Sequence, residues 1–180
     1  MPGGSIRLFV GVPVPDAAVA SAAAAAGRLL TDRSARVVPA GSHHVTLRFL
    51  GAVTEGDLPS LVAAIALATS DVPATSARLR GLGAFPGGRR RARILWAGVA
   101  DDGTLARLAA ALRDLPGDRP QEPFVAHVTL ARYDPPARVP EASDAPGGPV
   151  GEAFPVDRVV LYRSRPGSAY EPLEIFPLGR

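Results

Sequence analysis

The tetrapeptide HVTL occurs twice in the sequence, at 44–47 within GSHHVTLRFLG (41–51) and at 127–130 within HVTLARY (127–133). The two copies start 127 − 44 = 83 residues apart, close to half of the 180 residues. The sequence contains three histidines, and two of them, His44 and His127, open the identical tetrapeptides. A repeat at this period indicates an internally duplicated chain with two lobes.

Each copy of HVTL is predicted to be a strand, because β-branched and aromatic residues surround it. Alternate side chains of a strand share a face. His44 and Thr46 therefore point to one side while Val45 points into apolar packing, and His127 and Thr129 repeat the arrangement. Two such strands facing each other would surround one small anion with two imidazoles and two hydroxyl groups.

This set of side chains predicts phosphodiester cleavage. A neutral imidazole can take a proton from the attacking water, and a protonated one can give a proton to the departing ribose oxygen. Thr46 and Thr129 can donate hydrogen bonds to the nonbridging phosphate oxygens. The predicted reaction uses no cofactor, and no cluster of carboxylates lies near the motifs in the sequence to hold a metal.

The remaining pattern predicts an α+β fold with antiparallel sheets. Strands are expected at 6–12, 36–38, 41–51, 77–85, 93–99, 124–133, 156–163 and 170–178, and helices at 16–30, 55–69 and 103–115. The Pro- and Gly-rich stretch 135–151 is predicted to be a loop. Because helices alternate with pairs of adjacent strands, a doubly wound parallel sheet is not favoured. We expect one domain spanning 1–180.

The composition is that of a folded chain, with 47% apolar and 21% charged residues. The absence of cysteine excludes disulfides and thiolate metal sites. No apolar stretch is long enough to span a membrane and no leader is evident, so we expect a soluble, cytoplasmic protein. All 20 basic residues are arginine, which reflects either a coding bias or a phosphate-bearing partner.

The histidines also admit structural and metal-binding interpretations. His43 neighbours His44 on the opposite face of the strand, and a structural role is favoured for it. A zinc site built from His43, His44 and His127 is disfavoured, since adjacent strand residues point apart. A duplication without catalysis is the remaining alternative for the twin motif.

The twin motif resembles the signature of the two-histidine (2H) phosphoesterase superfamily, His-x-Thr-x given twice. The sequence is most similar to RNA 2′,3′-cyclic phosphodiesterases, also called 2′-5′ RNA ligases or LigT-like proteins. The similar segments include RLFVGVPVP (7–15), HVTLRFLG (44–51), GLGAFPGGRRRARILWAGV (81–99), HVTLAR (127–132) and VVLYRSRPGSAYEPLEIFPL (159–178). One departure is Ala126, where the family often has proline before the second histidine.

The resemblance implies two antiparallel sheets with flanking helices, related by a pseudo-two-fold axis, and a cleft between the lobes. It implies that His44 is the proton donor and His127 the acceptor, although the near-symmetric motifs do not settle that order. The implied reaction opens RNA 2′,3′-cyclic phosphates to 2′-phosphates, with 2′-5′ joining as a reverse reaction. RNA ends or small cyclic nucleotides are the expected partners of a monomer.

Four residues near the motifs are candidates for RNA or base contacts. Phe49 and Arg132 each lie five positions after a motif histidine and could sandwich a nucleobase. Strict alternation places this pair on the face opposite the histidines, so the idea requires a bulge or a twist. The alternative is that Phe49 belongs to the core and that Arg132 is a surface charge. Alternation instead places Arg48 with His44, and Tyr133 with His127.

A basic patch follows the strand expected at 77–85. Arg89, Arg90, Arg91 and Arg93 could hold an RNA backbone, or could be a solvated loop. Trp96 is favoured as a core residue rather than a stacking platform.

Two rival functions remain open from the sequence. One is a related 2H enzyme acting on another ester, such as ADP-ribose 1″,2″-cyclic phosphate or 2′-5′ oligonucleotides. The other is a non-catalytic RNA-binding module.

Overall fold

The computed structural model describes residues 4–27, 30, 33–86, 91–118, 123–139, 149–165 and 169–179. The helices within them are α1 (Asp16–Gly27), the 3₁₀ turn η1 (Glu55–Asp57), α2 (Leu58–Thr69) and α3 (Thr104–Ala111). The strands are β1 (Ser5–Pro13), β2 (Ala35–Val37), β3 (His44–Thr54), β4 (Thr75–Phe85), β5 (Ala92–Ala100), β6 (His127–Ala137), β7 (Pro149–Val156), β8 (Arg158–Arg165) and β9 (Ala169–Pro177).

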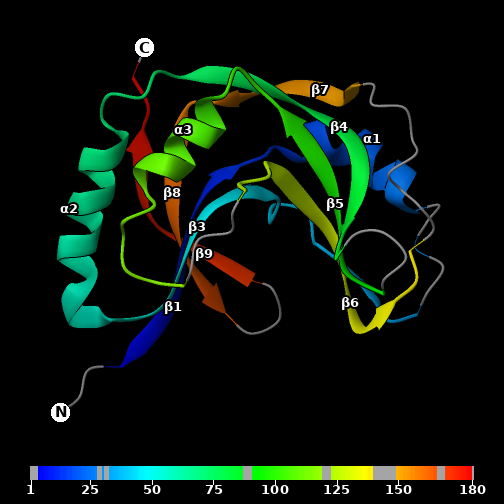
Figure 1. The fold of residues 1–180 in the computed structure, drawn as a ribbon, viewed down its shortest axis with the longest axis horizontal. Helices are drawn as coiled ribbons and strands as arrows, with labels where there is room; N and C mark the ends of the chain where they lie inside the picture. Colours follow the sequence, from blue (N-terminus) through cyan, green and yellow to red (C-terminus); the bar gives the residue numbers. More distant parts are fainter. Residues whose placement is uncertain are drawn as a thin grey trace.

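The strands form one antiparallel sheet in the order β7-β4-β5-β6-β3-β1-β8-β9, with β2 paired to β6. The sheet curls into a half-barrel (Figure 1). Its two halves meet at β3 and β6, which are joined in register at Val45 and Val128. We call β3, β1, β8 and β9 the β3 lobe, and β7, β4, β5 and β6 the β6 lobe. The two predicted sheets are therefore two halves of one sheet.

The two lobes exchange helices. The unit β1–α1–β2–β3 has the same element order as β5–α3–β6 apart from the short strand β2, and each unit ends in a strand that carries HVTL. α1 packs against β4 and β7 of the β6 lobe, whereas α3 packs against β3. Figure 1 shows this exchange, with α1 beside the β6 lobe and α3 beside the β3 lobe. The arrangement agrees with the expected pseudo-two-fold symmetry.

Small apolar side chains explain how α1 docks onto the sheet. Ala18, Val19, Ala22 and Ala26 recur at helical spacing and are at most 2% exposed. Because alanine projects little from the helix axis, this face approaches the strands closely. The apolar run of β1 is buried from Leu8 to Val12 at the centre of the other lobe. Burial of these faces is the main stabilising contribution to the fold.

The expected elements are largely confirmed. The α+β class, the antiparallel sheet and the three helices agree with the structure. β7 was not predicted, because Pro149–Val156 overlaps the stretch assigned to a loop. Within the part of the chain that the structure describes, no helix is long and apolar enough to cross a membrane.

Candidate active site

The four predicted motif residues surround one strand pair. Val45 and Val128 are directly opposite each other and fully buried. The residues that flank the two valines point to the other face of the sheet and are partly exposed; they are His44, Thr46, His127 and Thr129. One register pair thus brings both imidazoles and both hydroxyl groups to the same face of the junction between the lobes.

Hydrogen bonds of the same kind orient the two imidazoles. Nδ1 of His44 lies 2.9 Å from the carbonyl oxygen of Ser42, and Nδ1 of His127 lies 2.7 Å from that of Val125. A carbonyl oxygen only accepts hydrogen bonds, so Nδ1 carries the proton in each neutral ring. The lone pair is therefore on Nε2 in both histidines, and Nε2 is the atom available for proton transfer.

Aromatic rings surround His44. The centroids of Phe9 and Tyr170 lie 4.7 Å and 4.9 Å from its ring, with Tyr170 in an edge-on arrangement. Tyr162 is 5.9 Å away and stacks on Phe9. These three aromatic residues were not assigned a role from the sequence. Each of them lies on a different strand, Phe9 on β1, Tyr162 on β8 and Tyr170 on β9, and no sequence period links them to the motif strands.

A smaller aromatic pair lies beside His127. Phe85 meets the ring edge-on at 5.1 Å, and Trp96 lies 5.8 Å away. Phe85 and Trp96 stack on each other with centroids 5.0 Å apart. Trp96 is partly exposed and covers Gly83, so it borders the site rather than filling the core.

Burial among these rings makes both imidazoles weak bases. It lowers the pKa of His44 to about 4, and the hydrogen bond to Ser42 offsets part of this effect. Burial also lowers the pKa of His127, and the hydrogen bond to Val125 raises it by a smaller amount. The positive charge of Arg132 lowers both pKa values further. Both rings are therefore neutral at pH 7 in the free protein.

A β-bulge in β3 brings Phe49 to the histidine face. Gly11 pairs with Thr46 and Val10 pairs with Arg48, so Leu47 is an extra residue in the ladder. The extra residue reverses the alternation after Thr46. Phe49 lies opposite Phe9 and is 51% exposed.

An equivalent bulge in β6 brings Arg132 to the same face. Trp96 pairs with Thr129 and Leu95 pairs with Ala131, which leaves Leu130 as the extra residue. Phe49 and Arg132 therefore occupy equivalent positions on the two motif strands, as their shared spacing indicated. The bulge on which the prediction of this pair depended is present in both strands.

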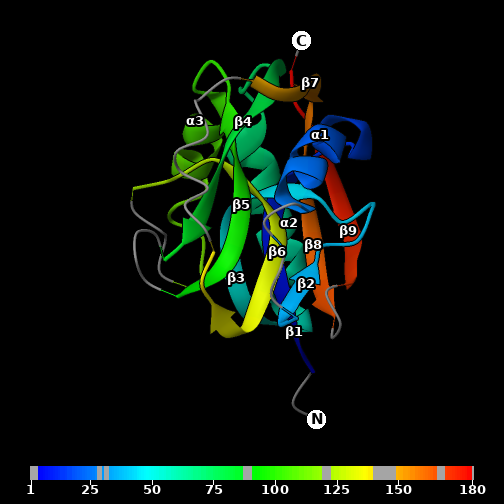
Figure 2. The same cartoon turned by 90° about the vertical axis from the view of Figure 1, so that its right-hand side faces the viewer.

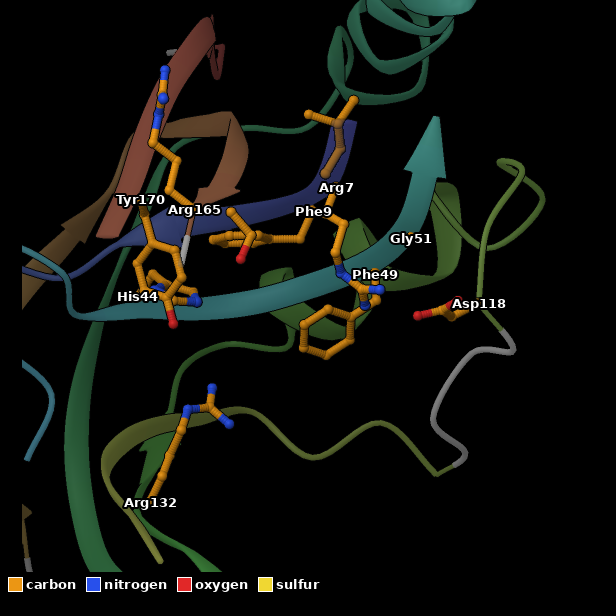
Figure 3. A pocket seen from close by; sticks show the side chains of 11 residues that line it. Arg7, Phe9, His44, Phe49, Gly51, Asp118, Arg132, Arg165 and Tyr170 are labelled. Atoms are coloured by element: carbon orange, nitrogen blue, oxygen red, sulfur yellow. The ribbon is translucent and has the colours of Figure 1, made fainter. Parts of the chain in front are cut away.

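Phe49 and Arg132 line one pocket with His44. The pocket has a volume of about 220 Å³ and extends along β3 from His44 past Phe49 to Asp118, with Arg7 above it (Figure 3). Arg132 extends into it from β6 on the other side. His127 does not line this pocket and lies beside it on β6, close enough for its charge to lower the pKa of His44.

The same bulges correct the prediction for Arg48 and Tyr133. Arg48 points away from Phe9 with its partner Val10, is 6% exposed, and donates to the carbonyl oxygens of Leu115 (2.7 Å) and Asp118. Tyr133 is 3% exposed and packs in the core. Neither shares the histidine face, because strict alternation does not hold through the motifs.

The other candidates lie outside the pocket. Nδ1 of His43 is 3.1 Å from Oδ1 of Asp16, in agreement with a structural role. Arg91 is exposed and donates to the carbonyl oxygen of Pro136 (3.3 Å), while Arg89 and Arg90 lie outside the described residues. Among the described residues, no three His, Cys, Asp or Glu side chains are placed to hold a metal ion.

An antiparallel two-lobed fold with a His-x-Thr pair from each lobe defines a class of known proteins. The model of the 2′-5′ RNA ligase superfamily matches residues 13–167, and the chain belongs to this superfamily. Its hydrolase class is also confirmed by its relatives. The RNA 2′,3′-cyclic phosphodiesterase of Thermus thermophilus is 36% identical over 96% of this chain and 90% of that protein. The protein of the same name from Archaeoglobus fulgidus is 30% identical over 95% and 99% of the two chains.

Solved structures agree with this assignment. The crystal structure of TT0787 of Thermus thermophilus superposes with a TM-score of 0.78 at 34% identity, covering 97% of this chain and 100% of that one. The E. coli LigT structure complexed with 3′-AMP has a TM-score of 0.78 over 98% and 99% of the two chains. Its identity of 23% shows a shared fold alone.

Proposed function

We propose that this protein hydrolyses the 2′,3′-cyclic phosphate ends of RNA to 2′-phosphomonoesters. The observation that carries the proposal is the placement of two histidines and two threonines around the single Val45–Val128 pair, on one face of the sheet. The names of the relatives support this substrate class.

The two histidines divide the proton transfers. The neutral Nε2 of His127 removes a proton from water, and the water oxygen forms a bond to phosphorus. The bond from phosphorus to the 3′ oxygen breaks, and the protonated Nε2 of His44 gives its proton to that oxygen. The phosphate remains on the 2′ oxygen. Each transfer typically contributes about 10²–10⁴-fold to the rate, and the order of roles follows the family resemblance.

The donor role of His44 depends on the charge of the substrate. Its pKa of about 4 leaves it neutral in the free protein. A phosphodiester bound beside the ring brings a negative charge, which favours the imidazolium. Substrate binding and protonation of His44 are therefore coupled in the proposed mechanism.

Thr46 and Thr129 supply the remaining contacts with the phosphate. Each threonine follows its histidine by two residues on the same strand, so its hydroxyl lies on the same face as the imidazole. Hydrogen bonds from both to the nonbridging oxygens would stabilise the charge that develops as water adds.

Phe49 and Arg132 are proposed to hold the terminal nucleobase. They line the pocket from opposite lobes, and Phe49 exposes half of its surface there. A base between a phenyl ring and a guanidinium is held by stacking, which tolerates any base identity. With a ribose 5′ hydroxyl in the place of water, the same site would form a 2′-5′ linkage.

The test is incubation with 2′,3′-cyclic AMP and with an oligonucleotide ending in a cyclic phosphate, followed by identification of the phosphate isomer. We expect the 2′-phosphate, with nearly all turnover lost in His44→Ala and in His127→Ala. His43→Gln is the matched control, since His43 contacts Asp16 outside the pocket. Full activity of either alanine variant refutes the proposal.

Substrate specificity and metal dependence are tested in the same assay. ADP-ribose 1″,2″-cyclic phosphate and 2′-5′ oligonucleotides should be turned over more slowly than cyclic-phosphate ends. EDTA should leave the rate unchanged, and inhibition that zinc reverses would contradict a mechanism carried by the two imidazoles alone.

A further inference from the structure

A second cavity adjoins the pocket, and Arg132 lines both of them. Its volume is about 390 Å³, and it lies along β2, β6 and β5. Figure 2 shows β6 between the other two strands. The side chains that characterise it are Arg36, Arg93, Arg132, Val37, Ile94 and Asp134. We call it the β2 groove.

The β2 groove concentrates positive charge, which comes from Arg36, Arg93 and Arg132. Arg36 lies directly opposite Arg132 in the β2–β6 ladder, so two like charges share one face. Such a pair is destabilising unless an anion lies between the charges. In the described part of the chain, neither of these arginines nor Arg93 has a carboxylate within ion-pair distance. Among the described residues that line the groove, Asp134 is the one acidic side chain.

Apolar surface lies beside these charges. Val37 is 60% exposed on β2, and Ile94 is directly opposite Arg132 on β5. A groove with several guanidinium groups and exposed apolar side chains fits a nucleic acid strand, whose phosphates are anionic and whose bases are apolar on their faces.

Arg132 joins the β2 groove to the active site, since it lines both cavities. A cyclic phosphate occupies the 3′ end of an RNA, so the rest of the chain can leave the pocket only through the 5′ oxygen of the terminal nucleotide. A strand that leaves past Arg132 meets Arg36 and Arg93 next.

We propose that the β2 groove binds the single-stranded RNA on the 5′ side of the cyclic end, with Arg36 and Arg93 contacting its phosphates. This inference rests on the proposed function and extends it, because it makes an RNA chain a better substrate than a free cyclic nucleotide. Removal of one contact between an arginine and a phosphate should lower kcat/KM for an RNA chain about tenfold. It should also make kcat/KM for that substrate less sensitive to salt.

The experiment compares kcat/KM for 2′,3′-cyclic AMP and for a pentanucleotide with the same cyclic end. Arg36→Gln and Arg93→Gln should each lower the value for the pentanucleotide about tenfold and leave that for cyclic AMP unchanged. Asp134→Asn should raise the pentanucleotide value. The control is Arg78→Gln, which removes an exposed arginine of β4 that lines neither cavity.

Three outcomes overturn the inference. The first is a wild-type protein that uses both substrates equally well. The second is an equal loss for both substrates in Arg36→Gln. The third is that Arg7→Gln, and not Arg36→Gln or Arg93→Gln, lowers kcat/KM for the pentanucleotide alone. Arg7 also lines the pocket, so this result would mean that the RNA chain leaves past Arg7.

A binding measurement separates the inference from the proposed function. Fluorescence anisotropy of a labelled pentanucleotide ending in a 2′-phosphate requires no turnover. If neither substrate is hydrolysed, the proposed function fails. Weaker binding by Arg36→Gln than by Arg78→Gln then still supports RNA binding in the β2 groove, and equal binding by the two variants refutes it.

Discussion

A bound anion should return His44 to its protonated form. Its pKa of about 4, against the ordinary 6.5, corresponds to about 3 kcal/mol against protonation. One negative charge about 4 Å from the ring contributes about 4 kcal/mol in favour of the imidazolium at an effective dielectric constant of about 20. The two effects nearly cancel, so a phosphate bound at the motif residues should raise the pKa of His44 to at least its ordinary range.

The assay is an NMR titration of the imidazole Cε1–H signals, with and without saturating adenosine 2′-phosphate. The chain has three histidines, so His43→Gln and His44→Gln assign every signal. We expect a large upward change of the His44 pKa on binding of the ligand. If the ligand binds and the pKa of His127 rises while that of His44 stays near 4, the donor and acceptor roles are reversed and the reasoning above is wrong.

The other predictions concern pH, packing and stability. Because both site histidines have lowered pKa values, kcat/KM should peak below pH 6.5, and a peak above that value would contradict the assignment. Between pH 6.5 and about 4, the unfolded chain binds a proton at His44 that the folded chain does not. The free energy of unfolding, measured by urea titration, should therefore fall on acidification in the wild type and fall less in His44→Gln. Gly11→Ala would place a Cβ 2.9 Å from the Val45 carbonyl oxygen and 3.4 Å from Cδ2 of His44; it should lower kcat, whereas Gly27→Ala, with nothing within 4 Å, should not. Arg48→Met removes two charged hydrogen bonds from a buried arginine to the carbonyl oxygens of Leu115 and Asp118 and should cost about 2 kcal/mol of stability in chemical denaturation, and an unchanged midpoint would refute the structural role.

The sheet was predictable wherever strands are buried and rich in β-branched residues. β3 and β6 follow directly from the two HVTL segments. β7 escaped prediction because Pro149 and Pro155 interrupt its pattern. Proline is tolerated at the edge of a sheet, where one side of the backbone has no partner strand. β7 is the terminal strand beside β4, which is such a position.

The histidines and threonines were placed correctly because period-two alternation holds from His44 to Thr46 and from His127 to Thr129. Beyond the threonines the alternation fails, since Leu47 and Leu130 are the extra residues of two bulges. A bulge depends on backbone geometry in the ladder and has no sequence period. The sequence therefore indicated which residues lie near the motifs, but it did not indicate for each of them on which face of the sheet its side chain lies.

The helix exchange makes each half of the molecule incomplete without the other. The helix that covers β3 comes from the later unit, and the helix that covers β4 and β7 comes from the earlier one. A chain severed between α2 and β4 would yield two fragments, each holding a helix whose docking surface belongs to its counterpart. Such fragments would expose apolar surface when separate and bury it again on mixing, so this architecture favours reconstitution from two pieces over independent folding of either one.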